Sequence, residues 1–173
     1  MRTTVRVSRV APALLVAGLM TLVGRPATGQ EGIALGETPD TPTLETLDGE
    51  AVDLAEVVGT RPVLVEFWAT WCAVCRALEP RVREAHERFG DRVEFLVVAV
   101  GVSQNPAGIR RHLQRHPMPG RILWDGRGRA ARAFEAPGTG YIVILDETGE
   151  VVYTGTGTDQ DLAGALERTL EGS

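Results

Sequence analysis

Hydrophobic positions in the middle of the chain change from a strand-like to a helix-like pattern and back again. The segment 63–68 is an apolar, β-branched run short enough for a buried strand, and 93–100 is a second such run. Between them, apolar residues at 73–89 recur near one face of a helix, and arginine and glutamate fill most other positions until Gly90. This part of the chain predicts a strand, a helix and a second strand.

The flanking segments predict more strands and helices. Asp48-Gly49 separates two weakly alternating segments and 146–149 separates two others, so each pair predicts a β-hairpin. Thr158 and Asp161 have the spacing of a capping box for a last helix. The further elements expected are strands at 43–47, 51–54, 121–124, 141–145 and 150–153, and helices at 106–115, 130–134 and 159–170. Together they predict an α/β fold with a central mixed β-sheet, helices on both faces and an N-terminal β-hairpin.

The first 29 residues follow a different pattern from the rest. Three arginines without any acid precede a largely apolar stretch at 10–23 and turn-forming residues at 24–26, an order typical of a secretory signal peptide. The apolar stretch is shorter than the ~20 residues that span a bilayer, so cleavage is favoured over a membrane anchor. We predict a signal peptide at 1–29, a lead-in arm at 30–42 and one domain at 43–173. The protein is then exported to the periplasm or another extracytoplasmic space, or membrane-anchored if the signal is uncleaved.

Charge narrows the classes of partner. All 18 basic residues of the 173-residue chain are arginine, against 23 Asp plus Glu. Loss of residues 1–29 would remove four arginines and no acid, which changes the net charge from -5 to -9. A chain this acidic offers little surface for nucleic acid, which we therefore do not expect as a partner. The length is that of a single domain, and we expect a monomer.

The candidate chemistry lies in two cysteines, Cys72 and Cys75, at the expected junction of strand and helix. Two cysteines three apart in a first helical turn are within disulfide range. Cys72 would stand at the helix N-terminus, where unpaired amides and the helix dipole lower the pKa of a thiol. We predict that Cys72 is the attacking thiol at an exposed edge, and that the deeper Cys75 resolves the mixed disulfide.

Three alternatives stay open for this pair: buried structural thiols, an inert disulfide, or part of a metal site. Two cysteines are too few for a four-thiolate site, so a metal would need His86, His112 or His116 as further ligands. His112 and His116 stand among arginines, which favours a solvated helix face. We predict no bound metal.

The sequence VLVEFWATWCAVCRALEP at 63–80 resembles the active-site segment of the thioredoxin superfamily, and FWATWC at 67–72 is especially similar to exported TlpA/ResA-type thiol-disulfide oxidoreductases. The resemblance covers nearly all of the chain after residue 29. It implies a thioredoxin-like fold, a redox-active Cys72–Cys75 disulfide in place of a cofactor, and a kink at Pro80. It also implies protein disulfides as substrates and a membrane electron-donor protein as partner, with cytochrome c maturation as one use.

Glu66 lies six residues before Cys72, where thioredoxins carry a buried acid. Val65 and Phe67 flank it in the apolar run, so we expect it to be buried, with a raised pKa that suits it to exchange a proton with Cys75. The alternative is a glutamate that reaches solvent at the strand edge.

One position departs from the family pattern. The family places a cis-proline before the strand that faces the disulfide, and here Gly140 stands at that place, with Pro137 three residues earlier. Either Pro137 fills the role through a shifted loop, or the backbone is left less restrained. We expect the surround of the active site to comprise Trp68, Trp71, Ala73, Val74, Pro80, Thr139 and Gly140.

Two functions from different classes follow. The leading hypothesis is an extracytoplasmic thiol-disulfide oxidoreductase that reduces protein disulfides, because Ala73-Val74 places no cation between the cysteines and so disfavours a strong oxidant. The alternative is a thioredoxin-like copper(I) chaperone that uses the same two thiolates. A peroxiredoxin is not expected, because Ala69 stands where that class carries threonine.

Overall fold

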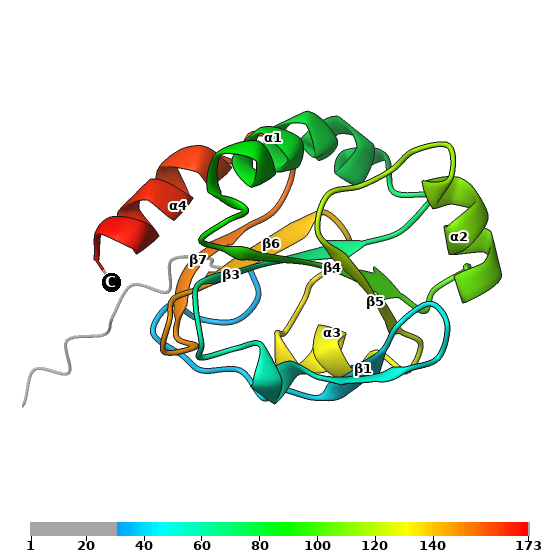
Figure 1. Cartoon of the computed structure of the whole chain (residues 1–173), viewed down its shortest axis with the longest axis horizontal. Coiled ribbons are helices and arrows are strands. Elements are labelled where there is room, and N and C mark those ends of the chain that lie inside the picture. Colours follow the sequence, from blue (N-terminus) through cyan, green and yellow to red (C-terminus); the bar gives the residue numbers. More distant parts are fainter. Residues whose placement is uncertain (1–30, 173) are drawn as a thin grey trace, which may run out of the picture.

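A computed structural model of the protein describes residues 31–172, so the expected signal peptide at 1–29 lies outside the described residues. Seven strands form one sheet in the order β2-β1-β5-β4-β3-β6-β7. Figure 1 shows this sheet between helices on both faces. The elements are β1 (Thr43–Glu45), β2 (Ala51–Asp53), the 3-10 turn η1 (Leu54–Glu56), β3 (Val63–Trp68), α1 (Ala73–Phe89), β4 (Glu94–Val100), α2 (Pro106–Leu113), β5 (Arg121–Asp125), α3 (Arg129–Ala133), β6 (Tyr141–Leu145), β7 (Val151–Gly155) and α4 (Leu162–Glu171).

The sheet is mixed, as the sequence predicts. Strands β3, β4 and β5 are parallel, whereas β6 pairs antiparallel with β3 and the hairpin β1–β2 pairs antiparallel with β5. All six residues of β3 are buried, because β4 and β6 flank the strand and helices cover the sheet. A strand buried on both faces reads as a continuous apolar run, which is the pattern seen at 63–68.

Each face of the sheet carries an apolar layer. Alternate residues of β3 point to opposite faces, and Val65 and Phe67 lie in the cluster that includes η1 and α3. Leu64 and Trp68 lie in the clusters that include α1, α2 and α4. By this alternation Glu66 falls on the face that α1 covers, between Leu64 and Trp68.

The start of the last helix differs from the prediction. Asp161, and not Thr158, is the N-cap of α4, and its carboxylate accepts a hydrogen bond from the Gly164 amide at 3.0 Å. The predicted start at Asp159 is wrong because Gln160 turns inward, where its amide donates to the Gly157 carbonyl at 2.8 Å. Residues 157–160 therefore form a loop. Other predicted boundaries agree with the structure to within two residues.

The arm before β1 is bound to the far edge of the sheet. The Gly36 amide donates to the Val151 carbonyl at 2.9 Å, and the Val151 amide donates to the Glu37 carbonyl at 2.8 Å. Ile33 is buried, and its amide donates to the Tyr141 hydroxyl at 3.1 Å. The described part of the expected lead-in arm therefore packs as part of the domain.

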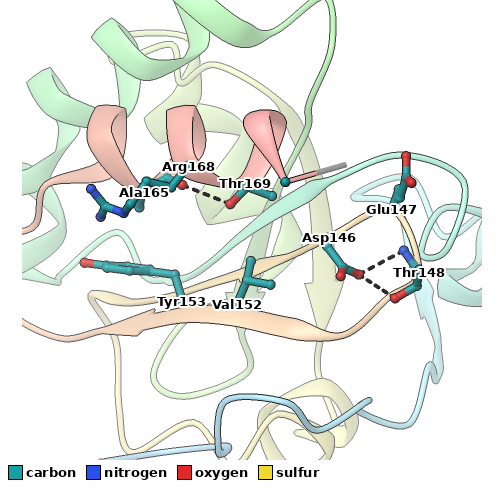
Figure 2. Close-up of a pocket in the computed structure, with 9 residues that line it drawn as sticks. Asp146, Glu147, Thr148, Val152, Tyr153, Ala165, Arg168 and Thr169 are labelled. Atoms are coloured by element: carbon teal, nitrogen blue, oxygen red, sulfur yellow. Dashed lines mark hydrogen bonds between the residues drawn. The ribbon is translucent and has the colours of Figure 1, made fainter.

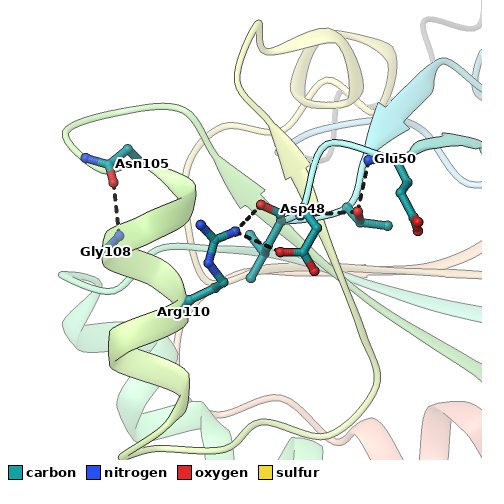
Figure 3. A network of polar contacts seen from close by, with 7 residues as sticks. Asp48, Glu50, Asn105, Gly108 and Arg110 are labelled. Atoms are coloured by element: carbon teal, nitrogen blue, oxygen red, sulfur yellow. Dashed lines mark hydrogen bonds and ion pairs between the residues drawn. The ribbon is translucent and has the colours of Figure 1, made fainter.

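Helix α2 is tied to the N-terminal hairpin. Arg110 donates to the Leu47 carbonyl and, at 3.1 Å, to the Asp48 carboxylate in the turn between β1 and β2 (Figure 3). Asn105 caps the start of α2 by accepting from the Gly108 amide at 3.0 Å. The Arg110 contacts therefore join α2 to the turn between β1 and β2.

Candidate active site

Cys72 and Cys75 form a disulfide at the junction of β3 and α1, with 5.3 Å between their Cα atoms. Cys72 is the N-cap of α1, in an extended backbone conformation, and its Sγ accepts a hydrogen bond from the Cys75 amide at 3.0 Å. The sulfur of Cys72 thus takes the place that a serine or aspartate oxygen takes at most helix N-termini. A thiolate at this position would face the positive end of the helix.

The two cysteines are less accessible than the sequence predicts. Cys72 is 3% exposed and Cys75 1%, because both pack in a cluster with Trp68 and Ile109. The residues around them are open, with Trp71 47% exposed. The prediction of an exposed edge therefore holds for the neighbours of Cys72 but is wrong for Cys72 itself.

Glu66 is fully buried, as the flanking residues predict, so the alternative of a solvent-facing glutamate is wrong. Neither carboxylate oxygen has a hydrogen-bond partner among residues 31–172. Burial, and to a lesser degree the negative charge of Glu79 on α1, raises the pKa of Glu66 from 4.5 to about 8. The side chain lies in the layer between the sheet and α1, and a group with this pKa can bind or release a proton near neutral pH.

Gly140 lies against the start of α1. Its amide donates to the Phe67 carbonyl at 2.8 Å, and its φ of +78° is in the region that favours glycine. A Cβ at this position would stand 2.6 Å from Cγ1 of Val74 and 3.9 Å from the Cys75 amide. Pro137 is exposed, and residues 31–172 contain no cis peptide bond. Gly140 itself therefore takes the place opposite the disulfide, and a shifted Pro137 does not.

The sequence analysis did not identify Gln160, whose side chain is hydrogen-bonded to the loop at Gly140. Its side chain is 3% exposed and donates to the Gly140 carbonyl at 3.2 Å and to the Gly157 carbonyl at 2.8 Å. The Tyr153 hydroxyl donates to its Oε1 at 3.3 Å. Hydrogen bonds to both sides of Gly140 thus restrain a backbone that lacks the expected proline.

The remaining predicted site residues differ in their burial and in their contacts. Trp68 is buried and packs edge-on against His112, with 5.5 Å between the ring centroids. The Trp71 indole N–H donates to the Val102 carbonyl at 2.9 Å. Trp71 and Thr139 line one groove of ≈ 430 Å³ with mostly apolar walls. Ala73 and Pro80 are exposed on α1.

No predicted site residue lines the cleft beside α4, and the described residues form no metal site. A cleft of ≈ 370 Å³ between the β6–β7 hairpin and α4 is lined by Tyr153 and Arg168 among others, and by none of the predicted site residues (Figure 2). Within residues 31–172, no group of three or more His, Cys, Asp or Glu side chains is placed to hold a metal ion. His112 and His116 lie together, with ring centroids 4.9 Å apart.

The model of the redoxin family matches residues 34–168. The chain belongs to the redoxin family. It is 28% identical over 147 residues to the thiol-disulfide oxidoreductase ResA of Geobacillus kaustophilus, a match that covers 83% of this chain and 80% of the relative.

Two solved structures share the fold of this redoxin. One is a putative thiol:disulfide interchange protein DsbE from Chlorobium tepidum, with TM-score 0.68, 20% identity and coverage of 81% of this chain and 97% of that one. The other is a secreted disulfide oxidoreductase of Mycobacterium tuberculosis, with TM-score 0.64, 21% identity and coverage of 74% and 96%. The protein is a thioredoxin-like thiol-disulfide oxidoreductase with a CxxC pair.

No helix within residues 31–172 of this redoxin is long and apolar enough to cross a membrane.

Glu66 should make the stability of the oxidised redoxin fall as pH rises. The folded state holds the Glu66 proton more tightly than the unfolded state, so the free energy of unfolding decreases between the unfolded pKa of 4.5 and the folded pKa of about 8. The slope approaches about 1.4 kcal/mol per pH unit. In urea unfolding at a series of pH values, Glu66→Gln should flatten this loss. Parallel curves for the two proteins would show that Glu66 is not buried as an acid.

Gly140→Ala should destabilise the redoxin by about 1–3 kcal/mol, because a positive φ and a contact with Val74 both oppose a Cβ there. The matched control is Gly138→Ala, two residues earlier in the same loop, where an added Cβ meets nothing within 4 Å. The control should stay within about 0.5 kcal/mol of the wild type in urea unfolding. Equal effects of the two substitutions would contradict the close approach of Gly140 to α1.

Proposed function

We propose that the protein reduces disulfide bonds of other proteins outside the cytoplasm. The observation that carries this proposal is the sulfur of Cys72 at the N-terminus of α1, where it accepts the Cys75 amide hydrogen bond. In the reduced protein this donor and the helix dipole stabilise a Cys72 thiolate, which is the nucleophilic form. Ala73 and Val74 add no cation between the cysteines, which favours a reductant over a strong oxidant.

In the first step the Cys72 thiolate attacks one sulfur of the partner's disulfide. A bond forms between Cys72 and that sulfur, and the other sulfur of the partner leaves as a thiolate that takes a proton from water. Trp71 and Val74 are exposed on either side of Cys72 in the sequence and provide an apolar surface for contact with the partner. The product of this step is a mixed disulfide between the two proteins.

In the second step Cys75 resolves the mixed disulfide. Glu66 in its ionised form accepts the Cys75 proton, and the resulting thiolate attacks Cys72. The bond between Cys72 and the partner breaks, the second partner sulfur leaves as a thiolate, and two electrons have passed to the partner. The Cys72–Cys75 disulfide of the structure is the product of this step. An electron donor, which we propose to be a membrane protein, returns the two electrons.

The proposed location rests on the sequence at 1–29, whose basic and apolar parts have the order of a signal peptide. It agrees with the secreted state of the Mycobacterium tuberculosis protein that shares the fold. In an oxidising compartment the Cys72–Cys75 pair forms a disulfide unless a donor reduces it, so action as a reductant requires that donor.

The two cysteines should behave differently when replaced. With insulin as substrate and dithiothreitol as electron source, Cys72→Ser should reduce insulin no faster than dithiothreitol alone, because the attacking thiol is gone. Cys75→Ser, reduced beforehand and freed of dithiothreitol, should stop after the first step and accumulate a mixed disulfide with insulin, which mass spectrometry under non-reducing conditions detects. Normal turnover by Cys75→Ser would contradict the assignment of the resolving thiol.

Copper(I) titration of the same reduced protein separates the oxidoreductase from the copper(I) chaperone. The reductase should turn over insulin many times without any copper(I). Tight stoichiometric copper(I) binding together with no insulin reduction would overturn the proposed function.

A further inference from the structure

The chain contains a long stretch with positive charge only. Between Glu94 and Asp125 there is no acidic residue, whereas there are four arginines and two histidines. This distribution stands out because acidic residues outnumber arginines by 23 to 14 after residue 29. The stretch includes α2, which packs through Ile109 in the same cluster as the two cysteines. Three of these four arginines, Arg110, Arg111 and Arg115, lie in α2 or in the turn that follows it, on the side of the molecule that holds the cysteine cluster.

A cleft of ≈ 410 Å³ lies between this helix and the active-site segment. Its walls are Thr70 and Trp71, the loop after β4, Arg111 and His112 of α2, and Arg115 in the turn after α2. Trp71 directly precedes Cys72, so one end of the cleft adjoins the reacting cysteine. We call this surface the α2 cleft.

Arg111, in α2, and Arg115, in the turn after α2, are both exposed and both line the cleft, and Nε of Arg115 donates to the Arg111 carbonyl at 3.4 Å. No ion pair joins either of them to an acid within residues 31–172. Arg110, by contrast, is bound to Leu47 and Asp48 of the hairpin turn (Figure 3). The α2 cleft therefore presents two guanidinium groups that the described chain does not neutralise.

The charges around His112 agree with a positive cleft. Burial is the main cause that lowers the pKa of His112, and the nearby charges of His116, Arg115 and Arg76 lower it further. Only Glu79 raises this pKa. A positive potential at an open cleft attracts carboxylates and orients them through guanidinium hydrogen bonds.

We propose that the α2 cleft binds an acidic segment of the partner protein, close in sequence to the partner's reacting cysteine. This inference rests on the proposed function and adds a substrate class to it. Carboxylates on Arg111 and Arg115 would place the adjoining partner disulfide beside Trp71 and above Cys72. Partners with acidic residues near their disulfide are then preferred, whereas basic flanks are repelled.

The test uses three disulfide peptides that share the same cysteine loop and carry acidic, neutral or basic flanks. Wild-type protein should reduce the acidic peptide with a kcat/KM about three- to tenfold above that of the neutral peptide, mostly through KM. Added salt should remove the difference, because the contacts are exposed. Arg111→Glu with Arg115→Glu should reverse the order of the acidic and basic peptides.

The matched control is Arg92→Glu with Arg121→Glu, which changes the net charge equally. Arg92 precedes β4 and Arg121 begins β5. Both therefore lie at the N-terminal ends of the parallel strands, whereas the disulfide follows the C-terminal end of β3. This control should keep the wild-type order of peptides. Equal reduction of all three peptides by wild type, or equal effects of the two double variants, would overturn the inference. Failure to reduce any peptide, the neutral one included, would instead overturn the proposed function.

Free inorganic phosphate distinguishes an acidic segment from a small anion as the natural occupant. Phosphate at an ionic strength matched with sodium chloride should slow reduction of the acidic peptide no more than the chloride does. Strong inhibition by phosphate alone would show a site for a small anion and would contradict the assignment of a polypeptide occupant.

Discussion

Cys72 closes the N-terminus of α1 with its own sulfur, where most helices use a side-chain oxygen. This single hydrogen bond from the Cys75 amide places Cys72 at the positive end of the helix and within disulfide distance of Cys75. Strand β3, buried along its whole length, holds the junction from the other side, so the backbone before Cys72 cannot shift without disturbing the core. The chemistry of the pair depends on this arrangement.

Two features of the segments that flank the disulfide are unfavourable for folding, and both suit the proposed reaction. Glu66 is buried without a hydrogen-bond partner among the described residues, which destabilises its charged form. Gly140 has a positive φ at a place where a proline would restrict the backbone more, and a hydrogen bond from Gln160 to its carbonyl restrains it instead. Local exceptions of this kind concentrate at functional sites, where stability is lost in exchange for a group with a useful pKa or a close approach of backbone.

Sequence patterns predicted those parts of the molecule that depend on neighbours along the chain. The buried run at 63–68 and the helical period at 73–89 are local signals, and they place Cys72 correctly at a helix start. The first residue of α4 was predicted wrongly because the capping-box spacing of Thr158 and Asp161 indicated a start after Thr158, whereas Gln160 turns inward and Asp161 is the N-cap. Gln160 and the α2 cleft could not be predicted, since each depends on contacts between segments far apart in sequence.

The reactivity of the two thiols in the reduced protein shows directly whether the helix N-terminus activates Cys72. Alkylation by iodoacetamide over a range of pH, with each modified cysteine identified by mass spectrometry, measures the two thiols separately. We expect Cys72 to react first, with a midpoint well below the ordinary thiol pKa of about 8.5, and Cys75 to stay protected. Alkylation of Cys75 as fast as Cys72, or a Cys72 midpoint at or above about 8.5, would contradict this expectation.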